Sequence, residues 1–246
     1  MFTGFPPETL QFFLDIRYHN DAAYYNANRD RFEKDVKAPF FALIEELLPV
    51  LQLADEQMET RPYKCLARLR RDTRFSKDKT PYRDHLWVWF HRAAEPREGS
   101  LGFWFELGLQ GVSWGMGGWG ENRPMMERFR RELAAKPEEI ASVIRQCGLE
   151  RHQLLDGGRE WKKMEVPPHI PPDMRSWYLR RELYISQQRP DMNEVGDRRI
   201  LEHVRKDFQT LTPIYRLLRG MGDAAAAELE ESAKNETGRI ADRAEW

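Results

Sequence analysis

Residues 101–119, LGFWFELGLQGVSWGMGGW, carry the pattern that decides the fold of this chain. In the first half, bulky apolar residues alternate with small or polar ones, which is typical of a strand with one buried face. The buried face would carry Leu101, Phe103, Phe105, Leu107 and Leu109. Because Gln110-Gly111 can turn the chain directly into VSWGMGGW, the stretch predicts a β-hairpin. Its alternating glycines predict the close approach of a backbone, an aromatic ring or a ligand.

Further strands are expected on both sides of the hairpin. HLWVWFHR (residues 85–92) is bulky on both faces, and RELYISQQ (181–188) has a strand-like pattern. YKCLARLRRDTRF (63–75) alternates apolar with basic residues and also predicts a strand. Between residues 152 and 164 we expect a ribbon that contains a turn, and the prolines of VPPHIPPDM (166–174) predict a loop.

Helices are expected before and after these strands. Apolar residues at helical spacing predict helices over residues 6–20, 22–36, 123–133 and 137–147, and another that begins at Pro39. A long helix over residues 200–218 would end at Gly220, which leaves residues 221–246 as a polar C-terminal tail or frayed helix. The order of helices, strands, helices, strand and helix favours the α+β class. We therefore predict a single α+β domain over residues 1–220, with helices packed on one face and at the ends of a curved antiparallel sheet.

The composition narrows the classes of function. With 246 residues, 41% of them hydrophobic, the chain is long enough to bury a sizeable core. Its net charge of −1 argues against polyanion binding by the whole surface, so any basic character has to be local. No apolar run approaches the roughly 18 residues of a membrane helix, and the N-terminus lacks the pattern of a signal peptide. We therefore expect a soluble, cytoplasmic protein without a membrane partner.

The two cysteines and six histidines do not predict a metal or redox site. Cys65 and Cys147 lie far apart in the sequence and are expected to be small core residues. His85 and His91 would share one face of a strand but lie about 20 Å apart, too far for one metal ion. The sequence therefore predicts no metal and no cofactor.

The segment RLRRDTRFSKDKTPYRDH, residues 68–85, is the candidate functional motif. Its first twelve residues contain six cations and two acids, which leave a local net charge of +4. Asp72 can begin a turn by accepting hydrogen bonds from amides two residues later, and Ser76 and Asp78 offer a second such turn. Pro81 would end the loop, because it fixes its own φ and lacks an N–H donor. We expect a compact loop that presents surplus cations near an end of the sheet.

Two interpretations of this motif stay open. Arginine forks and lysine charges suit phosphate or carboxylate, which predicts a site for a small anionic ligand. Alternatively, the two acids hold neighbouring cations in a salt-bridged structural loop. We favour the anion site, because four net cations lack partners inside the motif. The ligand would contact Arg68, Arg74, Lys79, Tyr82 and Arg180, and the side chains that orient this set would be Arg71, Asp72, Ser76 and Asp78.

Other functions are also open at this point. A nucleic-acid binder needs its basic charge to continue as an exposed stripe, and the near-neutral net charge counts against it. A protein-interaction module would expose aromatic residues around Trp119 or Tyr178. If Trp104 or Trp119 lay exposed beside the motif, it would offer a stacking platform. The sequence does not decide whether the protein is an enzyme, or its oligomeric state; a reaction would be transfer or hydrolysis at the anion.

The motif also resembles that of a known family. The pattern RxxRDxRFSxDKxPY, met here from Arg68 to Tyr82, resembles the hallmark of the largely microbial domain-of-unknown-function family 2461. An N-terminal region with Asn26, Asn28 and Arg29 is similar to the Asn-Arg signature of that family. A later block fits at Leu179-Arg180 but departs from the pattern over residues 161–164. The resemblance covers roughly residues 2–219 and implies an α+β fold without implying an activity.

Overall fold

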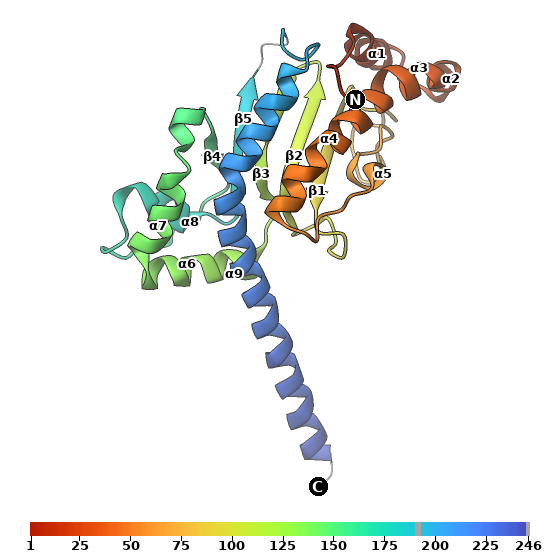
Figure 1. The fold of residues 1–246 in the computed structure, drawn as a ribbon. Helices are drawn as coiled ribbons and strands as arrows, with labels where there is room; N and C mark the ends of the chain where they lie inside the picture. Colours follow the sequence, from red (N-terminus) through yellow and green to blue (C-terminus); the bar gives the residue numbers. More distant parts are fainter. Residues whose placement is uncertain (190–192, 245–246) are drawn as a thin grey trace.

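The computed structural model describes residues 1–189 and 193–244, with an antiparallel sheet of five strands at the centre of this part (Figure 1). The strands β1 (His85–His91), β2 (Leu101–Gly108) and β3 (Gly111–Gly118) follow one another as neighbours. The later strands β5 (Tyr184–Arg189) and β4 (Leu155–Gly157) continue the sheet beyond β3. The predicted α+β class with one antiparallel sheet is therefore confirmed.

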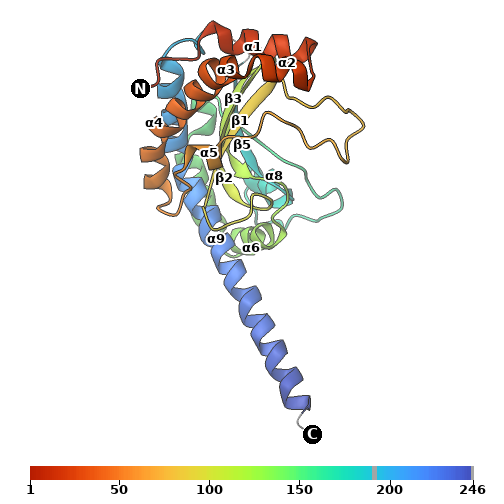
Figure 2. The ribbon, with the colours of Figure 1, turned by 90° about the vertical axis from the view of Figure 1, so that its right-hand side faces the viewer.

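Two long helices cover one face of the sheet. Figure 2 shows α4 (Ala38–Ala54) and α9 (Arg199–Ala244) on one side, and the loops around residues 66–84 and 158–171 projecting from the other. The Phe103 ring on β2 lies 4.9 Å from the ring of Phe208 and 5.0 Å from the ring of Tyr215, both on α9. Alternation along each strand thus buries one face under helices and leaves an open face opposite.

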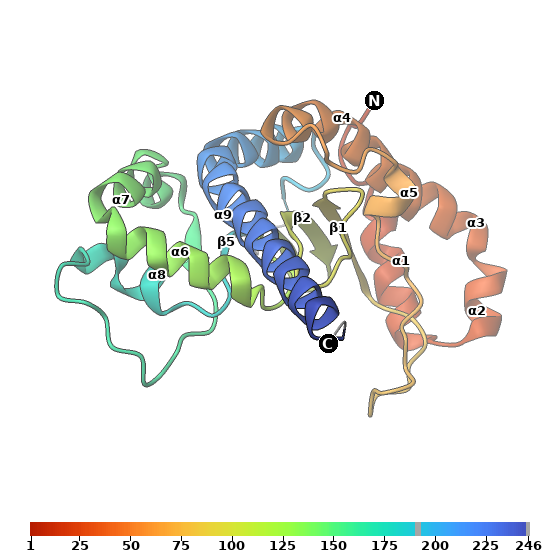
Figure 3. The same cartoon turned by 90° about the horizontal axis from the view of Figure 1, so that it is seen from below.

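The remaining helices lie at the sides of the sheet (Figure 3). Near β1 are α1 (Pro7–Tyr18), α2 (Ala22–Ala27), α3 (Arg29–Arg31) and a π-helical turn, η1 (Phe32–Lys37), which leads into α4. Near β5 are α6 (Arg123–Ala135), α7 (Pro137–Gln146), α8 (Arg175–Leu179) and the 3-10 turns η2 (Leu149–His152) and η3 (Pro172–Met174). The helix predicted over residues 22–36 is therefore segmented, because Asn28 has a non-helical φ of −114°.

The strand predicted over residues 63–75 is wrong. Its first residues form a short helix, α5 (Pro62–Cys65), because proline at the first helical position fixes a helical φ. The rest is extended, but among the described residues it meets the sheet through one isolated bridge, Leu66 with Val88 of β1, while Arg70 pairs with Tyr82, which precedes β1. The segment after α5 therefore runs along the edge of β1 without joining the sheet as a full strand.

The predicted end of the last helix at Gly220 is also wrong. Gly220 has no left-handed backbone conformation, and the alanine-rich sequence after it favours helix, so α9 continues to Ala244 (Figure 1). Trp246 lies outside the described residues. Among the helices of residues 1–189 and 193–244, none combines the length and apolarity needed to cross a membrane.

The hairpin turn lies one residue earlier than predicted. Leu109 and Gln110 form the turn, and Gly108 pairs with Gly111, which has a φ of +134° and already belongs to β3. On the open face, the Trp104 ring lies across Gly115 of the neighbouring strand, where an added Cβ would meet ring carbons at 2.7 Å. The predicted close approach of an aromatic ring to a strand glycine is confirmed.

Glu46 ties the N-terminal segment and the residue just before α9 to α4. Glu46 accepts hydrogen bonds from the Phe2 amide at 2.6 Å and from Arg198 Nη1 at 2.9 Å. The hydrogen bonds from Arg198, against the smaller effect of burial and with help from the Phe2 amide, lower the pKa of Glu46 from 4.5 to about 2. The ionised carboxylate therefore stabilises the fold above its unfolded pKa, and this contribution is lost as the pH falls towards 2.

Two glycine substitutions test this fold in opposite directions. Nothing lies within 4 Å of a Cβ added at Gly220, so Gly220→Ala should raise the free energy of unfolding by about 0.5–1 kcal/mol. A Cβ added at Gly115 would lie 2.1 Å from the Ile185 carbonyl oxygen, so Gly115→Ala should lower it by about 1–3 kcal/mol. Urea denaturation measures both. A loss of stability in Gly220→Ala would contradict a continuous α9.

The Glu46 ion pair predicts a pH-dependent stability difference. At about pH 7, Glu46→Gln should lower the free energy of unfolding by about 1 kcal/mol, a value reduced for solvent screening. At about pH 3.5 the loss of unfolding free energy in the variant should be smaller. Protonation of Glu46 then begins to remove the contribution of the ion pair from the wild type as well. Urea denaturation at the two pH values measures the difference. The exposed neighbour Glu45, as Glu45→Gln, is the control; an equal deficit for Glu46→Gln at both pH values would contradict the assignment.

Candidate anion-binding site

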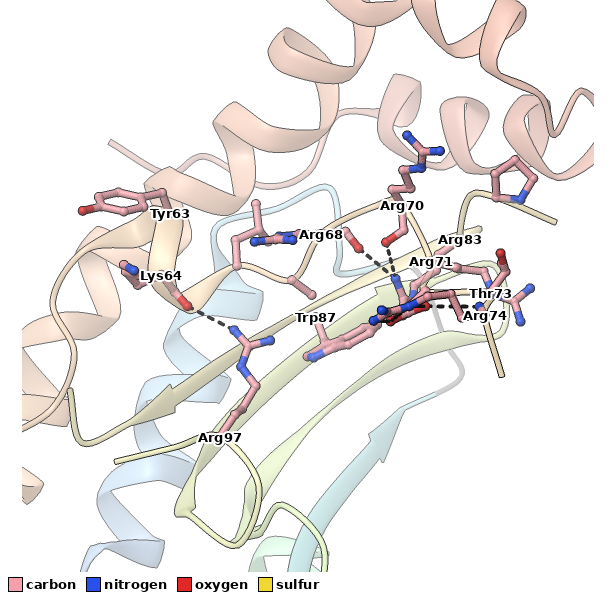
Figure 4. A pocket seen from close by; sticks show the side chains of 14 residues that line it. Tyr63, Lys64, Arg68, Arg70, Arg71, Thr73, Arg74, Arg83, Trp87 and Arg97 are labelled. Atoms are coloured by element: carbon pink, nitrogen blue, oxygen red, sulfur yellow. Dashed lines mark hydrogen bonds and ion pairs between the residues drawn. The ribbon is translucent and has the colours of Figure 1, made fainter. Parts of the chain in front are cut away.

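A hollow of about 730 Å³ lies between the segment that follows α5, the start of β1 and the loop that joins β1 to β2 (Figure 4). Its walls are unusually rich in positive charge. The cations that line it are Lys64, Arg68, Arg70, Arg71, Arg74, Arg83 and Arg97, and Asp72 is the acid among its described lining residues.

Backbone hydrogen bonds fix the wall that carries Arg68 and Arg70. The Ala67 amide donates to the Trp87 carbonyl oxygen at 2.9 Å, and the Arg83 amide donates to the Leu69 carbonyl oxygen at 3.0 Å. Ala67 and Leu69 are buried, whereas Arg68 and Arg70 are exposed. The predicted alternation, which sends Arg68 and Arg70 to the same side, is confirmed for this stretch.

The two acids of the motif organise the loop as the sequence predicted. The Arg74 amide donates to Asp72 Oδ1 at 3.2 Å, and the Thr80 amide donates to Asp78 Oδ1 at 2.9 Å. Arg74 and Arg71 also pair with Asp72 and Asp78, respectively, and each arginine lowers the pKa of its partner carboxyl to about 2. These two arginines are therefore already compensated by acids of the loop.

Four other arginines have no such compensation. Arg68, Arg70, Arg83 and Arg97 form no ion pair with a carboxylate anywhere in residues 1–189 and 193–244. Arg83 and Arg97 are only partly exposed. Burial lowers the pKa of both, and a nearby cation lowers it further, Arg71 for Arg83 and Arg68 for Arg97. Because guanidinium groups stay charged in proteins, this desolvation is a cost that no acid offsets.

Backbone carbonyls and indole rings hold the two partly buried arginines in place. Arg83 Nη1 donates to the carbonyl oxygens of Arg68 and Arg70, both at 3.0 Å, and Arg97 Nη2 donates to the Lys64 carbonyl oxygen at 3.1 Å. These bonds occupy one nitrogen of each guanidinium, so other N–H donors are free for a ligand.

The indole rings lie directly under these guanidiniums. Arg83 is 4.8 Å from the Trp87 ring and Arg97 is 5.9 Å from the Trp119 ring, and the two rings stack at 6.0 Å. Trp87 Nε1 is buried without a hydrogen-bond partner in the described structure. The hollow therefore combines fixed cations with the indole ring of Trp87.

The structure brings only part of the predicted site together. Arg68 and Arg74 line the hollow. Lys79 donates to the Thr73 carbonyl oxygen at 2.8 Å and braces the loop. Tyr82 is buried against Tyr25, with ring centroids 4.7 Å apart, and lines a neighbouring hollow. The Ser76 hydroxyl makes no hydrogen bond to the described residues.

Arg180 is not part of the lining. It pairs with Asp156 at 3.1 Å and with Glu160 at 3.2 Å, on the β4 side of the sheet. The sequence-based prediction omitted Arg70, Arg83, Trp87 and Arg97. Arg70 and Arg83 belong to the motif segment and could have been included, whereas no spacing in the sequence pointed to Arg97. No group of three or more His, Cys, Asp or Glu side chains in the described ranges is placed to hold a metal ion.

Similarity to known proteins indicates the family of this chain but no activity. No curated protein matches the chain. The sequence model of one family, described as conserved hypothetical protein (DUF2461), matches residues 8–216, a range that contains the whole lining of the hollow. Since this match spans most of the 246 residues, the chain belongs to the conserved hypothetical protein family DUF2461.

Proposed function

We propose that this protein binds a small anionic ligand, with a phosphoryl group or several carboxylates, in the hollow lined by Arg68, Arg70, Arg83 and Arg97. The observation that carries the proposal is the set of four guanidiniums without a carboxylate partner around one hollow. Two of them are partly buried, so an anion would offset a desolvation cost that the protein alone leaves uncompensated.

The geometry suits an anion with several oxygen atoms. Guanidinium forks offer paired N–H donors that match phosphate and carboxylate oxygens. Arg83 and Arg97 are held from behind by carbonyl oxygens and indole rings, so they lose little rotamer freedom when a ligand binds. The volume of about 730 Å³ falls in the range of small-molecule sites, about 300–1,000 Å³.

The distribution of charge favours a small ligand over a nucleic acid. The basic side chains without carboxylate partners that the proposal uses line one hollow, while the chain as a whole has a net charge of −1. Arg71 and Arg74, which lie further along the loop, are paired with acids and offer little free charge to extend the site. A polyanion would need a longer stripe of uncompensated cations.

Anion binding and its dependence on the unpaired arginines can be measured directly. A thermal-shift screen of phosphate, pyrophosphate, sugar phosphates, dicarboxylates and nucleotides should identify a ligand that stabilises the protein. At 100 times its Kd, this ligand should raise the free energy of unfolding by about 2.7 kcal/mol. Arg68→Gln should then weaken binding about tenfold or more in isothermal titration, because a charge-assisted hydrogen bond contributes about 1.5–3 kcal/mol. The Arg68 side chain makes no hydrogen bond to the described residues, so this variant should fold normally.

Arg74→Gln is the matched control on the rim of the same hollow. It removes one positive charge that is already paired with Asp72, so it should change the affinity less than threefold or so. Equal losses in Arg68→Gln and Arg74→Gln would indicate a general charge effect and contradict the proposal. Absence of binding by every anion in the screen would also contradict it.

A further inference from the structure

A second hollow, of about 480 Å³, lies against the first one and shares a wall with it. The shared residues are Tyr63, Leu66, Ala67, Arg68 and Arg70. Figure 4 shows Arg70 directed away from the Trp87 ring of the first hollow. The extended segment after α5 is thus a common wall, and Arg68 and Arg70 on it border both hollows.

The far side of the second hollow is aromatic and rigid. Tyr25 stacks on Tyr82 with centroids 4.7 Å apart, and Phe32 meets the Tyr25 ring edge-on at 5.8 Å. The backbone of Tyr82 is anchored by Asn20, which accepts from its amide at 2.9 Å and donates to its carbonyl oxygen at 3.0 Å. Tyr82 and Phe32 are buried, whereas Tyr25 and Phe41 are partly exposed, so these last two rings supply apolar surface of the kind on which planar ring systems stack.

Polar groups at the second hollow have no described partners. The Asn26 amide and the hydroxyl groups of Tyr25 and Tyr82 make no hydrogen bond within residues 1–189 and 193–244. Asn26 is exposed, so its amide can both donate to and accept from the edge of a ligand. The lysine of this hollow, Lys37, is paired with Glu33 at 2.7 Å. Away from the shared wall, the hollow therefore suits a neutral planar group with hydrogen-bonding edges.

This inference rests on the proposed function. We propose that the ligand is a nucleotide whose phosphoryl group lies among Arg68, Arg83 and Arg97 and whose base lies in the second, aromatic hollow. A nucleotide joins an anionic group to a planar heterocycle with donor and acceptor edges, which are the two chemistries that the adjoining hollows provide. A phosphate ion alone would leave the aromatic hollow unused. Asn26 would contact the edge of the base, and Phe41 would contribute to the walls beside it.

Isothermal titration of the full chain with three probes tests this inference. Adenosine 5′-monophosphate and guanosine 5′-monophosphate carry a base, whereas ribose 5-phosphate lacks it. At least one nucleotide should bind about tenfold tighter than ribose 5-phosphate, because stacking of one base on aromatic side chains contributes about 1–3 kcal/mol. Arg68→Gln should weaken binding of all probes that bind.

Two variants of the second hollow locate the base. Asn26→Ala and Phe41→Leu should each reduce the ratio of nucleotide affinity to ribose 5-phosphate affinity by about threefold or more. The affinity for ribose 5-phosphate itself should stay unchanged. Asn26 is exposed and Phe41→Leu preserves most of the volume, so both variants should fold, which thermal denaturation checks.

The outcomes separate the inference from the proposed function. If ribose 5-phosphate binds as tightly as both nucleotides, or if neither variant reduces the advantage of the nucleotide, the inference is overturned while anion binding stands. If none of the three probes binds, the inference is overturned, and if the wider anion screen also gives no ligand, the proposed function fails as well. A nucleotide preference that depends on Asn26 and Phe41 supports the inference.

Discussion

The packing of α9 on β2 is the constraint on which the rest of the molecule depends. Phe103 of β2 meets Phe208 and Tyr215 of α9 at about 5 Å, and this contact commits one face of the sheet to the core. Because side chains alternate along a strand, the opposite face receives Trp87 and Trp104, with Gly115 beside the Trp104 ring. The edge of that open face is where the segment after α5 lies, so the arginine hollow is a consequence of which face the helices cover.

Charge compensation divides the arginines around the hollow into two groups. Arg71 and Arg74 have carboxylate partners in their own loop, so they shape it. Arg83 and Arg97 instead donate to backbone carbonyl oxygens and lie on indole rings, which holds their positions without neutralising their charge. The salt-bridged interpretation of the sequence therefore describes Arg71 and Arg74, and the uncompensated charge on which the proposed anion site rests lies beside that loop. This division explains why a segment with two acids still surrounds a strongly positive hollow.

Local patterns in the sequence predicted what local physics controls. The alternation of β2, the direction of Arg68 and Arg70 and the turns at Asp72 and Asp78 all depend on neighbours within a few residues. The sequence could not predict that Arg97 lines the hollow or that Arg180 lies away from it. Both facts depend on where a loop and a distant helix end lie in three dimensions. The stop at Gly220 was predicted from glycine alone, although the helix-forming residues that follow it determine the outcome. The strand after residue 62 was predicted from alternation, yet an edge segment alternates in the same way without full pairing.

The central claim is that guanidiniums left without acids in this protein are a binding site, and nitrogen-15 NMR of arginine side chains tests it most directly. Titration with pyrophosphate should shift the Nε–H resonances of Arg83 and Arg97 saturably and with one dissociation constant, because both guanidiniums face the same hollow. The Nε–H resonance of Arg145, which is already paired with Asp173 at 2.7 Å on the far side of the molecule from the motif, should stay unchanged. Resonances of Arg83 and Arg97 that move no more than that of Arg145 would contradict the account and leave these arginines as supports of the backbone alone.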